Sequence, residues 1–237
     1  MKLHRRIVEA DNGFSLVELM VAMFLTFIAT AGIYKSYISF TVTTETQEQR
    51  VEMQQDLRIA LNAMAKEIRK AGYDPTDNAD SAIETADLGV IEFTMDLNED
   101  EDNTDNDVDL NDNAILDGNE MYADERVRYF LSGSDLMRQD VNAGTNQIVI
   151  SNVSALQFRY FVEDGVTPAD TATAEDREEI RVVQIALVVE TTKNDFSYTD
   201  LTTYIDPLGN IVLAAQNDNK QRKMIVKRVS CRNMGLD

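Results

Sequence analysis

The chain has 237 residues, 43% of them apolar, which allows one domain of about 200 residues with a hydrophobic core. Its net charge of −20 at pH 7 would repel DNA and anionic lipid, so we expect no nucleic-acid partner for the bulk of this domain. The single cysteine, Cys231, excludes an intramolecular disulfide.

An apolar run occupies residues 14–34, and Glu18 is its only charge. As a helix it would be about 30 Å long, which is the thickness of the hydrocarbon core of a bilayer. Lys2, Arg5 and Arg6 precede the run, so the positive-inside rule places the N-terminus in the cytoplasm and the rest of the chain outside. A carboxylate in such a helix is costly, which makes Glu18 a candidate functional residue.

The junction between Gly13 and Phe14 lies before the apolar run, whereas a secretory signal peptide is cut after its apolar region. A cut after Gly13 would keep the helix in the mature protein and create a new α-amine on Phe14. Glu18 stands four residues further on. A carboxylate one helical turn away, or on a neighbouring copy, could pair with this ammonium.

The segment NGFSLVELMVAMFLT, residues 12–26, resembles the N-terminal signature of type IV prepilins and pseudopilins. The resemblance implies that a prepilin peptidase cuts after Gly13 on the cytoplasmic side and N-methylates Phe14. It also implies that Glu18 pairs with the amine of a neighbouring subunit during assembly. The implied partners are the peptidase, other major and minor pilins or pseudopilins, and the inner membrane.

Two other interpretations of the N-terminus remain. An A-x-A sequence ends at Ala31, and signal peptidase cleavage there would release a soluble protein. The acidic residues Glu9 and Asp11 fit a signal peptide poorly. An uncleaved signal anchor is the second interpretation.

A single long helix is predicted from Phe14 to about Ala71, roughly 85 Å if unbroken. Its second half carries an apolar stripe for a globular head, with Gly72 as a C-cap. The stripe consists of Leu57, Leu61, Met64 and Ile68. The segment LRIALNAMAKEIRKAGYDP, residues 57–75, resembles PilW-type minor pilins and the related J-type minor pseudopilin.

An acidic insert is predicted at residues 96–125, with no Lys or Arg between Lys70 and Arg126. Oxygen ligands recur at every second position, at Asp96, Asn98, Asp100 and Asp102. Such spacing can fold around one Ca²⁺, although Glu101 stands where an EF-hand loop needs glycine. The alternative is a solvated acidic loop without metal. PilW-like proteins often carry an Asp/Asn-rich insert after a similar strand.

The remainder of the head is expected to form strands. They are predicted at residues 89–95, 126–131, 135–138, 147–150, 155–162, 180–191 and 223–229. The stretch 180–191 is the richest in β-branched residues and is predicted to be central. Residues 194–215 are irregular, with part of them in a shorter hairpin. The basic C-terminus, from Lys220 to Arg232, is predicted to be an edge or surface strand, or else a patch for an acidic partner.

The predicted fold is α+β and pilin-like, with a long N-terminal helix packed on an antiparallel β-sheet head that consists of one sheet or a pair of sheets. The predicted divisions are a leader at 1–13, a transmembrane and filament-core helix at 14–34, and the rest of the helix with the head at 35–237. The single histidine, His4, lies in the leader, and no Gly-rich phosphate loop precedes a helix, so we expect no enzyme.

The predicted function is a minor pilin in type IV pilus assembly, held in the inner membrane with its head in the periplasm before it enters a pilus or pseudopilus. The J-type minor pseudopilin of a type II secretion system is one alternative. A membrane-anchored Ca²⁺-binding domain that never polymerises is the other.

Overall fold

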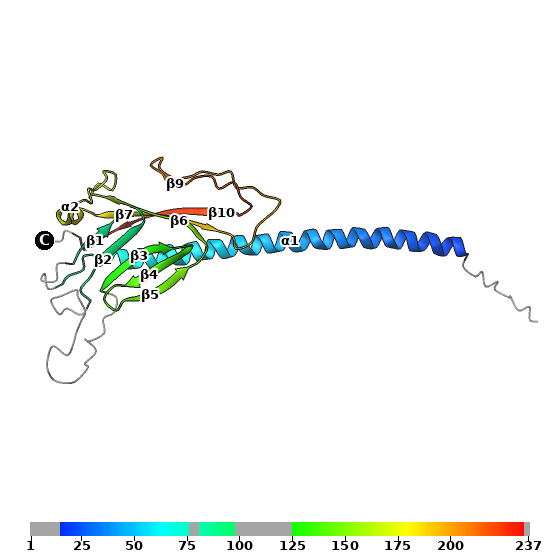
Figure 1. Ribbon diagram of the computed structural model, residues 1–237, viewed down its shortest axis with the longest axis horizontal. Coiled ribbons are helices and arrows are strands. Elements are labelled where there is room, and N and C mark those ends of the chain that lie inside the picture. The colour runs from blue at the N-terminus through cyan, green and yellow to red at the C-terminus, as the bar shows by residue number, and fades with distance from the viewer. Residues whose placement is uncertain (1–14, 76–80, 98–124, 235–237) are drawn as a thin grey trace, which may run out of the picture. The chain divides into compact units, whose positions relative to one another are not determined.

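The computed structural model of the protein describes residues 15–75, 81–97 and 125–234. These residues form two compact units, one within residues 1–48 and one within residues 49–237. The fold is α+β, with a long N-terminal helix and antiparallel sheets (Figure 1), as predicted.

The long helix, α1, spans Leu16–Ile68. It contains no proline, and the hydroxyl groups of the threonines between residues 41 and 46 donate to carbonyls one turn earlier, so this threonine-rich stretch stays helical. After Ile68 the chain makes tight turns, and Gly72 has a φ of +75°, as expected of a residue that ends a helix. The predicted stop is therefore confirmed, while the α-helix itself ends three residues before the predicted Ala71.

The head contains a five-stranded antiparallel meander and a three-stranded antiparallel sheet. The meander consists of β1 (Ile83–Ala86), β2 (Val90–Thr94), β3 (Arg126–Ser132), β4 (Asp135–Asp140) and β5 (Thr145–Ile150), in that order. The smaller sheet has the order β10 (Arg222–Ser230), β7 (Val182–Glu190) and β6 (Val153–Phe161). The short elements are α2 (Ala174–Glu178) and the two-stranded pair of β8 (Tyr204–Ile205) and β9 (Ile211–Leu213).

The strand predictions are largely confirmed. β7 is the central strand of its sheet, and β10 lies at the edge, as the sequence indicated. The hairpin between β3 and β4 turns at Gly133, whose φ of +63° explains why glycine stands there. β1 and α2 were not predicted, and the strands form two main sheets, which is one of the two predicted arrangements.

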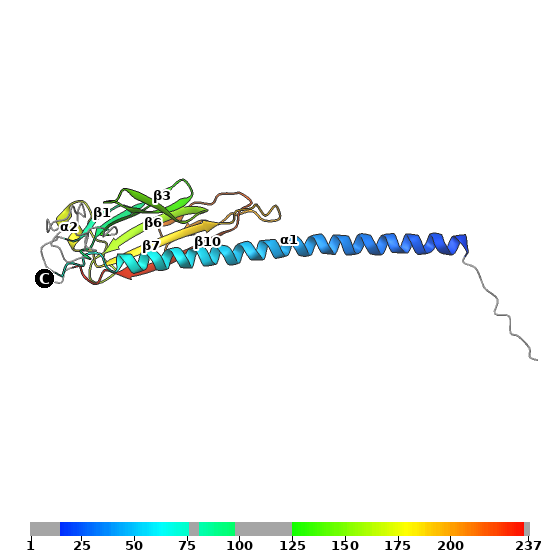
Figure 2. The same ribbon diagram turned by 90° about the horizontal axis from the view of Figure 1, so that it is seen from below.

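One face of α1 packs into the core between these sheets. Its buried side chains are Met53, Leu57, Ala60, Leu61, Met64, Ala65 and Ile68, which include the whole predicted stripe. They share one hydrophobic cluster with Phe93 and Tyr129 of the meander and Phe158 and Leu187 of the smaller sheet. Figure 2 shows α1 running beside β10, where Lys227 Nζ donates to Asn62 Oδ1 at 2.8 Å.

Candidate assembly site

The start of α1 is capped by Ser15. The Val17 N–H donates to Ser15 Oγ at 3.3 Å, and the Leu19 N–H donates to the Ser15 carbonyl at 3.1 Å. Glu18 is the acidic residue of the first helical turn, where a carboxylate interacts favourably with the positive end of the helix dipole. The spacing from Ser15 to Glu18 is that of a capping box, a signal in the sequence that our prediction did not use.

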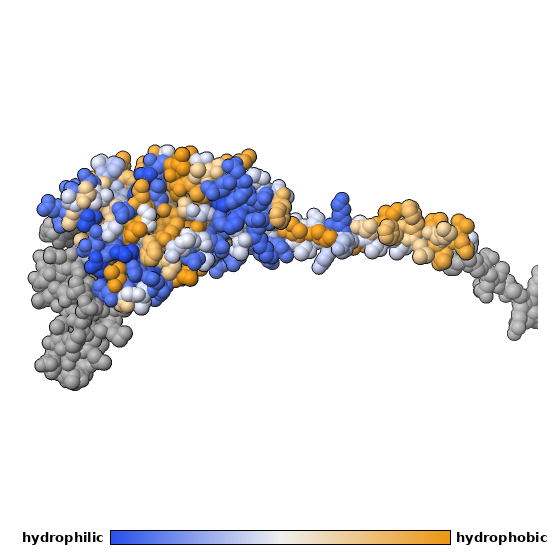
Figure 3. Space-filling view, in the orientation of Figure 1, coloured by the Kyte–Doolittle hydropathy of each residue, from blue (hydrophilic) through white to orange (hydrophobic). Residues whose placement is uncertain are grey.

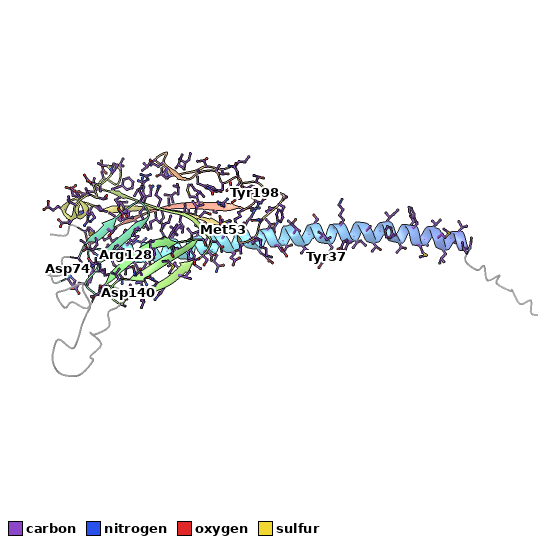
Figure 4. The ribbon with its side chains drawn as sticks, in the orientation of Figure 1. Tyr37, Met53, Asp74, Arg128, Asp140 and Tyr198 are labelled. Carbon is purple, nitrogen blue, oxygen red and sulfur yellow. The ribbon has the colours of Figure 1, made fainter. Side chains whose placement is uncertain are left out.

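The first part of α1, as far as Tyr34, is apolar around most of its circumference, and nothing within the described residues covers the N-terminal half of the helix. Residues 15–44 are all exposed, and Phe24 and Phe27 are 65% and 74% exposed. Figure 3 shows the N-terminal end of the helix as a largely apolar surface, with polar residues between this end and the head, and Figure 4 shows Tyr37 with its side chain directed away from the helix axis. By length and composition this helix could cross a membrane. Water is a poor solvent for such a surface, so lipid or neighbouring helices must cover it.

The two threonine hydroxyl groups within the apolar run are satisfied by the helix itself. Thr26 Oγ1 donates to the Ala22 carbonyl and Thr30 Oγ1 donates to the Thr26 carbonyl, both at 2.8 Å. An unsatisfied hydroxyl would be costly in an apolar environment. Glu18 is therefore the only charged side chain of this run.

The predicted site residues divide between described and undescribed parts of the chain. Gly13 and Phe14 lie outside the described residues, and Glu18 is exposed on α1. Of the predicted calcium ligands only Asp96 is described; it is fully buried just after β2, and its N–H donates to the Tyr73 carbonyl at 2.7 Å. Asn98, Asp100 and Asp102 lie outside the described residues, and the described ones contain no cluster of three potential ligands. The calcium site stays a prediction.

Polar contacts fasten the second half of α1 to the meander. Glu67 accepts a hydrogen bond from the buried Tyr129 hydroxyl at 2.6 Å and pairs with Arg138 at 3.0 Å. Burial and the neighbouring Glu67 carboxylate raise the pKa of Tyr129 well above its ordinary value, so this hydroxyl remains a donor. The helix face that enters the head is thus oriented by a hydrogen-bonded carboxylate as well as by packing.

The C-terminal segment closes over the end of α1. Asn233 Nδ2 donates at 3.4 Å to the carbonyls of Arg69 and Lys70, which are among the last of the helical segment. Met234 packs against Gly72, where an added Cβ would lie 2.6 Å from the Met234 sulfur. Glycine is therefore required at this position by its backbone conformation and by its neighbour.

Two cations of the basic C-terminus, Lys220 and Arg222, form ion pairs within the chain. Arg222 is 3% exposed and pairs with Glu190, Asp200 and Asp218 at 2.8, 3.0 and 2.6 Å. Lys220 pairs with the same Glu190. The Arg222 guanidinium lowers the pKa of Asp218 to about 2. This network holds the segment after β7 to the smaller sheet, and no sequence pattern predicted it because its members come from three separate stretches.

Comparison with known families agrees with the geometry. Residues 46–206, more than half of the chain, match the family described as prepilin peptidase-dependent protein B, and residues 10–34 match the prokaryotic N-terminal methylation motif. No curated protein matches the chain. Among solved structures, a type IV-like pilin from Thermus thermophilus is similar, with 15% identity and a TM-score of 0.48 over 76% of this chain and 97% of that one. The chain belongs to the prepilin peptidase-dependent protein B family and carries the prokaryotic N-terminal methylation motif.

Proposed function

We propose that this protein is a minor pilin that helps to initiate a type IV pilus. One observation carries the proposal: an apolar helix with its whole circumference exposed, and a single acid near its start, is joined to a head that has its own core. Such a helix needs neighbours or lipid, whereas the head does not depend on the N-terminal half of the helix for its packing.

In the proposed sequence of events a prepilin peptidase cuts after Gly13 and methylates the new N-terminus at Phe14. Residues 14–34 first span the inner membrane and then enter the filament core, with residues 35–237 held on the periplasmic side. A carboxylate in a membrane helix costs about 2.5–3.5 kcal/mol at mid-bilayer. Pairing of Glu18 with the Phe14 amine of a neighbour offsets this cost, favours the filament over the membrane and fixes the stagger between subunits.

Replacing Glu18 by alanine tests this role. We expect normal cleavage and normal membrane levels, with the protein lost from the sheared filament fraction. Glu48→Ala is the matched control, because Glu48 is an exposed acid on the same helix outside the apolar run. Equal incorporation of the Glu18→Ala variant and the wild type would reject the pairing.

The alternative J-type minor pseudopilin function predicts the same cleavage and the same dependence on Glu18. It differs in the phenotype, because loss of the protein would stop secretion rather than surface piliation. Measuring both phenotypes in one deletion strain separates the two functions.

A further inference from the structure

A basic surface runs along the outer face of α1 and the adjoining strand β10. Its exposed or half-exposed cations are Arg58, Lys66, Arg69, Lys70, Lys223, Lys227 and Arg232. The Lys227 to Asn62 hydrogen bond joins the two elements side by side. We call these seven residues the α1–β10 surface.

Acids do not neutralise the α1–β10 surface within the described part of the chain. None of its seven cations forms an ion pair there. Between Gln55 and Ala71 the acids of α1 are Asp56, which is half-buried, and Glu67, which faces Tyr129 and Arg138. In a chain with a net charge of −20, the described residues thus include a positive face without ion pairs, and such charge segregation is typical of a surface that meets an acidic partner.

The same head presents an acidic segment of suitable charge. Residues 163–179, between β6 and β7, contain seven acids and one cation, Arg177, which donates to the Ile83 carbonyl. The acids exposed on this segment are Glu163, Asp164, Asp170, Glu175, Glu178 and Glu179. The segment is ordered by its own hydrogen bonds, including the capping box of Thr173 and Asp176 at the start of α2. We call it the α2 loop.

We infer that the α1–β10 surface binds the α2 loop of a second copy of this chain. The two surfaces differ, so the contact is heterologous: in a pair, one copy keeps its α2 loop free and the other keeps its α1–β10 surface free. The inference rests on the proposed function, because it names the partner that a pilin head would meet during assembly.

The dependence of association on salt concentration distinguishes the proposed contact from the effect of net charge alone. Two copies, each at −20, repel one another, and this repulsion weakens as salt is added. Attraction between the α1–β10 surface and the α2 loop also weakens with salt. Association driven by the local contact therefore falls with ionic strength, whereas association limited by net repulsion rises.

Cysteine crosslinking of the full-length protein in membranes tests the contact. One tagged copy carries Ile59→Cys beside the basic residues, a differently tagged copy carries Ala174→Cys in the α2 loop, and both positions are exposed. A short bismaleimide should join the unlike pair, with little product from either like pair. Asn146→Cys on β5 is the control position. The inference would be overturned if crosslinks between identical variants were as abundant as crosslinks between Ile59→Cys and Ala174→Cys. It would also be overturned if the Ile59→Cys to Ala174→Cys product did not exceed the product obtained with Asn146→Cys.

Charge exchange identifies the residues responsible. Two double variants each reverse the charge on one side of the contact: Lys66→Glu with Arg69→Glu, and Glu175→Lys with Glu178→Lys. When every copy carries the same double variant, the crosslinked yield should fall about tenfold. Co-expression of the two variants should restore the yield, because an acidic helix face then meets a basic loop. Failure of restoration, or a yield in the wild type that rises with salt, would contradict the proposed contact.

The N-terminus of the same samples is measured by mass spectrometry. Processed protein without the crosslink rejects the contact and leaves the proposed function intact. Unprocessed protein with the crosslink rejects the pilin function and retains the contact between heads.

Discussion

Replacing Arg222 by methionine would leave the carboxylates around it without their common cation. Asp200 is fully buried, and the Glu190 side chain is 14% exposed. The Arg222 guanidinium also donates to Ser154 Oγ at 3.1 Å, so methionine keeps the bulk of the side chain but removes the hydrogen bonds from Arg222 to four partners.

The expected loss follows from burial. Removing one partner of a buried ion pair costs about 3–5 kcal/mol, because the remaining charge stays desolvated. Lys220→Met is the matched control: Lys220 shares Glu190 with Arg222, but its own side chain is 32% exposed. An exposed pair contributes about 0.2–1 kcal/mol. The two variants remove the same charge and differ in the burial of the pairs that they break.

Urea unfolding of the full-length protein in detergent, followed by circular dichroism, measures the difference. With an m value of about 2 kcal/mol/M, Arg222→Met should lower the midpoint by roughly 1.5–2.5 M, and Lys220→Met by less than about 0.5 M. Similar small shifts in both variants would refute the claim that the network stabilises the head.

The stability of the network also depends on pH. Burial alone would raise the pKa of Asp200, but hydrogen bonds from the Thr202 backbone and from Arg222 hold it below its ordinary value, and the pKa of Asp218 is about 2. Carboxylates with lowered pKa values stabilise the fold above about pH 4, and this stabilisation is lost as the pH falls towards 2. The difference between wild type and Arg222→Met should therefore be largest near pH 7 and shrink below about pH 4. A difference that stays constant from pH 7 to pH 3 would contradict this assignment.

Three further predictions concern the head. Gly72→Ala should destabilise the head by about 1–2 kcal/mol because of the positive φ, and by more because the added Cβ clashes with Met234. Met234→Ala should relieve the clash but not the backbone strain, and a double-mutant cycle in urea would show this. Glu67→Gln should cost about 1.5–3 kcal/mol, because the buried Tyr129 hydroxyl then donates to a neutral acceptor, and unchanged unfolding would count against that role. Burial raises the pKa of the Cys231 thiol to about 12, so maleimide should label it at pH 7 only as the head unfolds, and rapid labelling of the folded protein would contradict its position.

Regular patterns in the sequence predicted most of the fold. The stripe that ends at Ile68 and the β-branched stretch that became β7 have strong periodicity or propensity, and both lie where they were predicted. β1 was missed because its four residues, Ile83–Ala86, show no alternation and depend on pairing with β2. Its strand conformation is set by tertiary contacts rather than by local preference.

The candidate site was predictable only where its chemistry is local. Glu18 and the apolar run stand out along the sequence, and Ser15 could have been recognised from its spacing to Glu18. The pairing of Arg222 with Asp200 joins residues from separate parts of the chain, so the buried position of Arg222 was not predicted. A single sequence does not reveal ion pairs between distant residues, because predicting them requires knowledge of which strands lie side by side.

The measurement that tests the central claim most directly is mass spectrometry of the N-terminus of the protein purified from cells that express a prepilin peptidase. We predict a mature chain that begins at N-methylated Phe14. A Gly13→Leu variant serves as the control and should retain the leader. A wild-type chain that begins at Gly32, or one that keeps its leader beside a functioning peptidase, would contradict the account and remove the basis for assembly through Glu18.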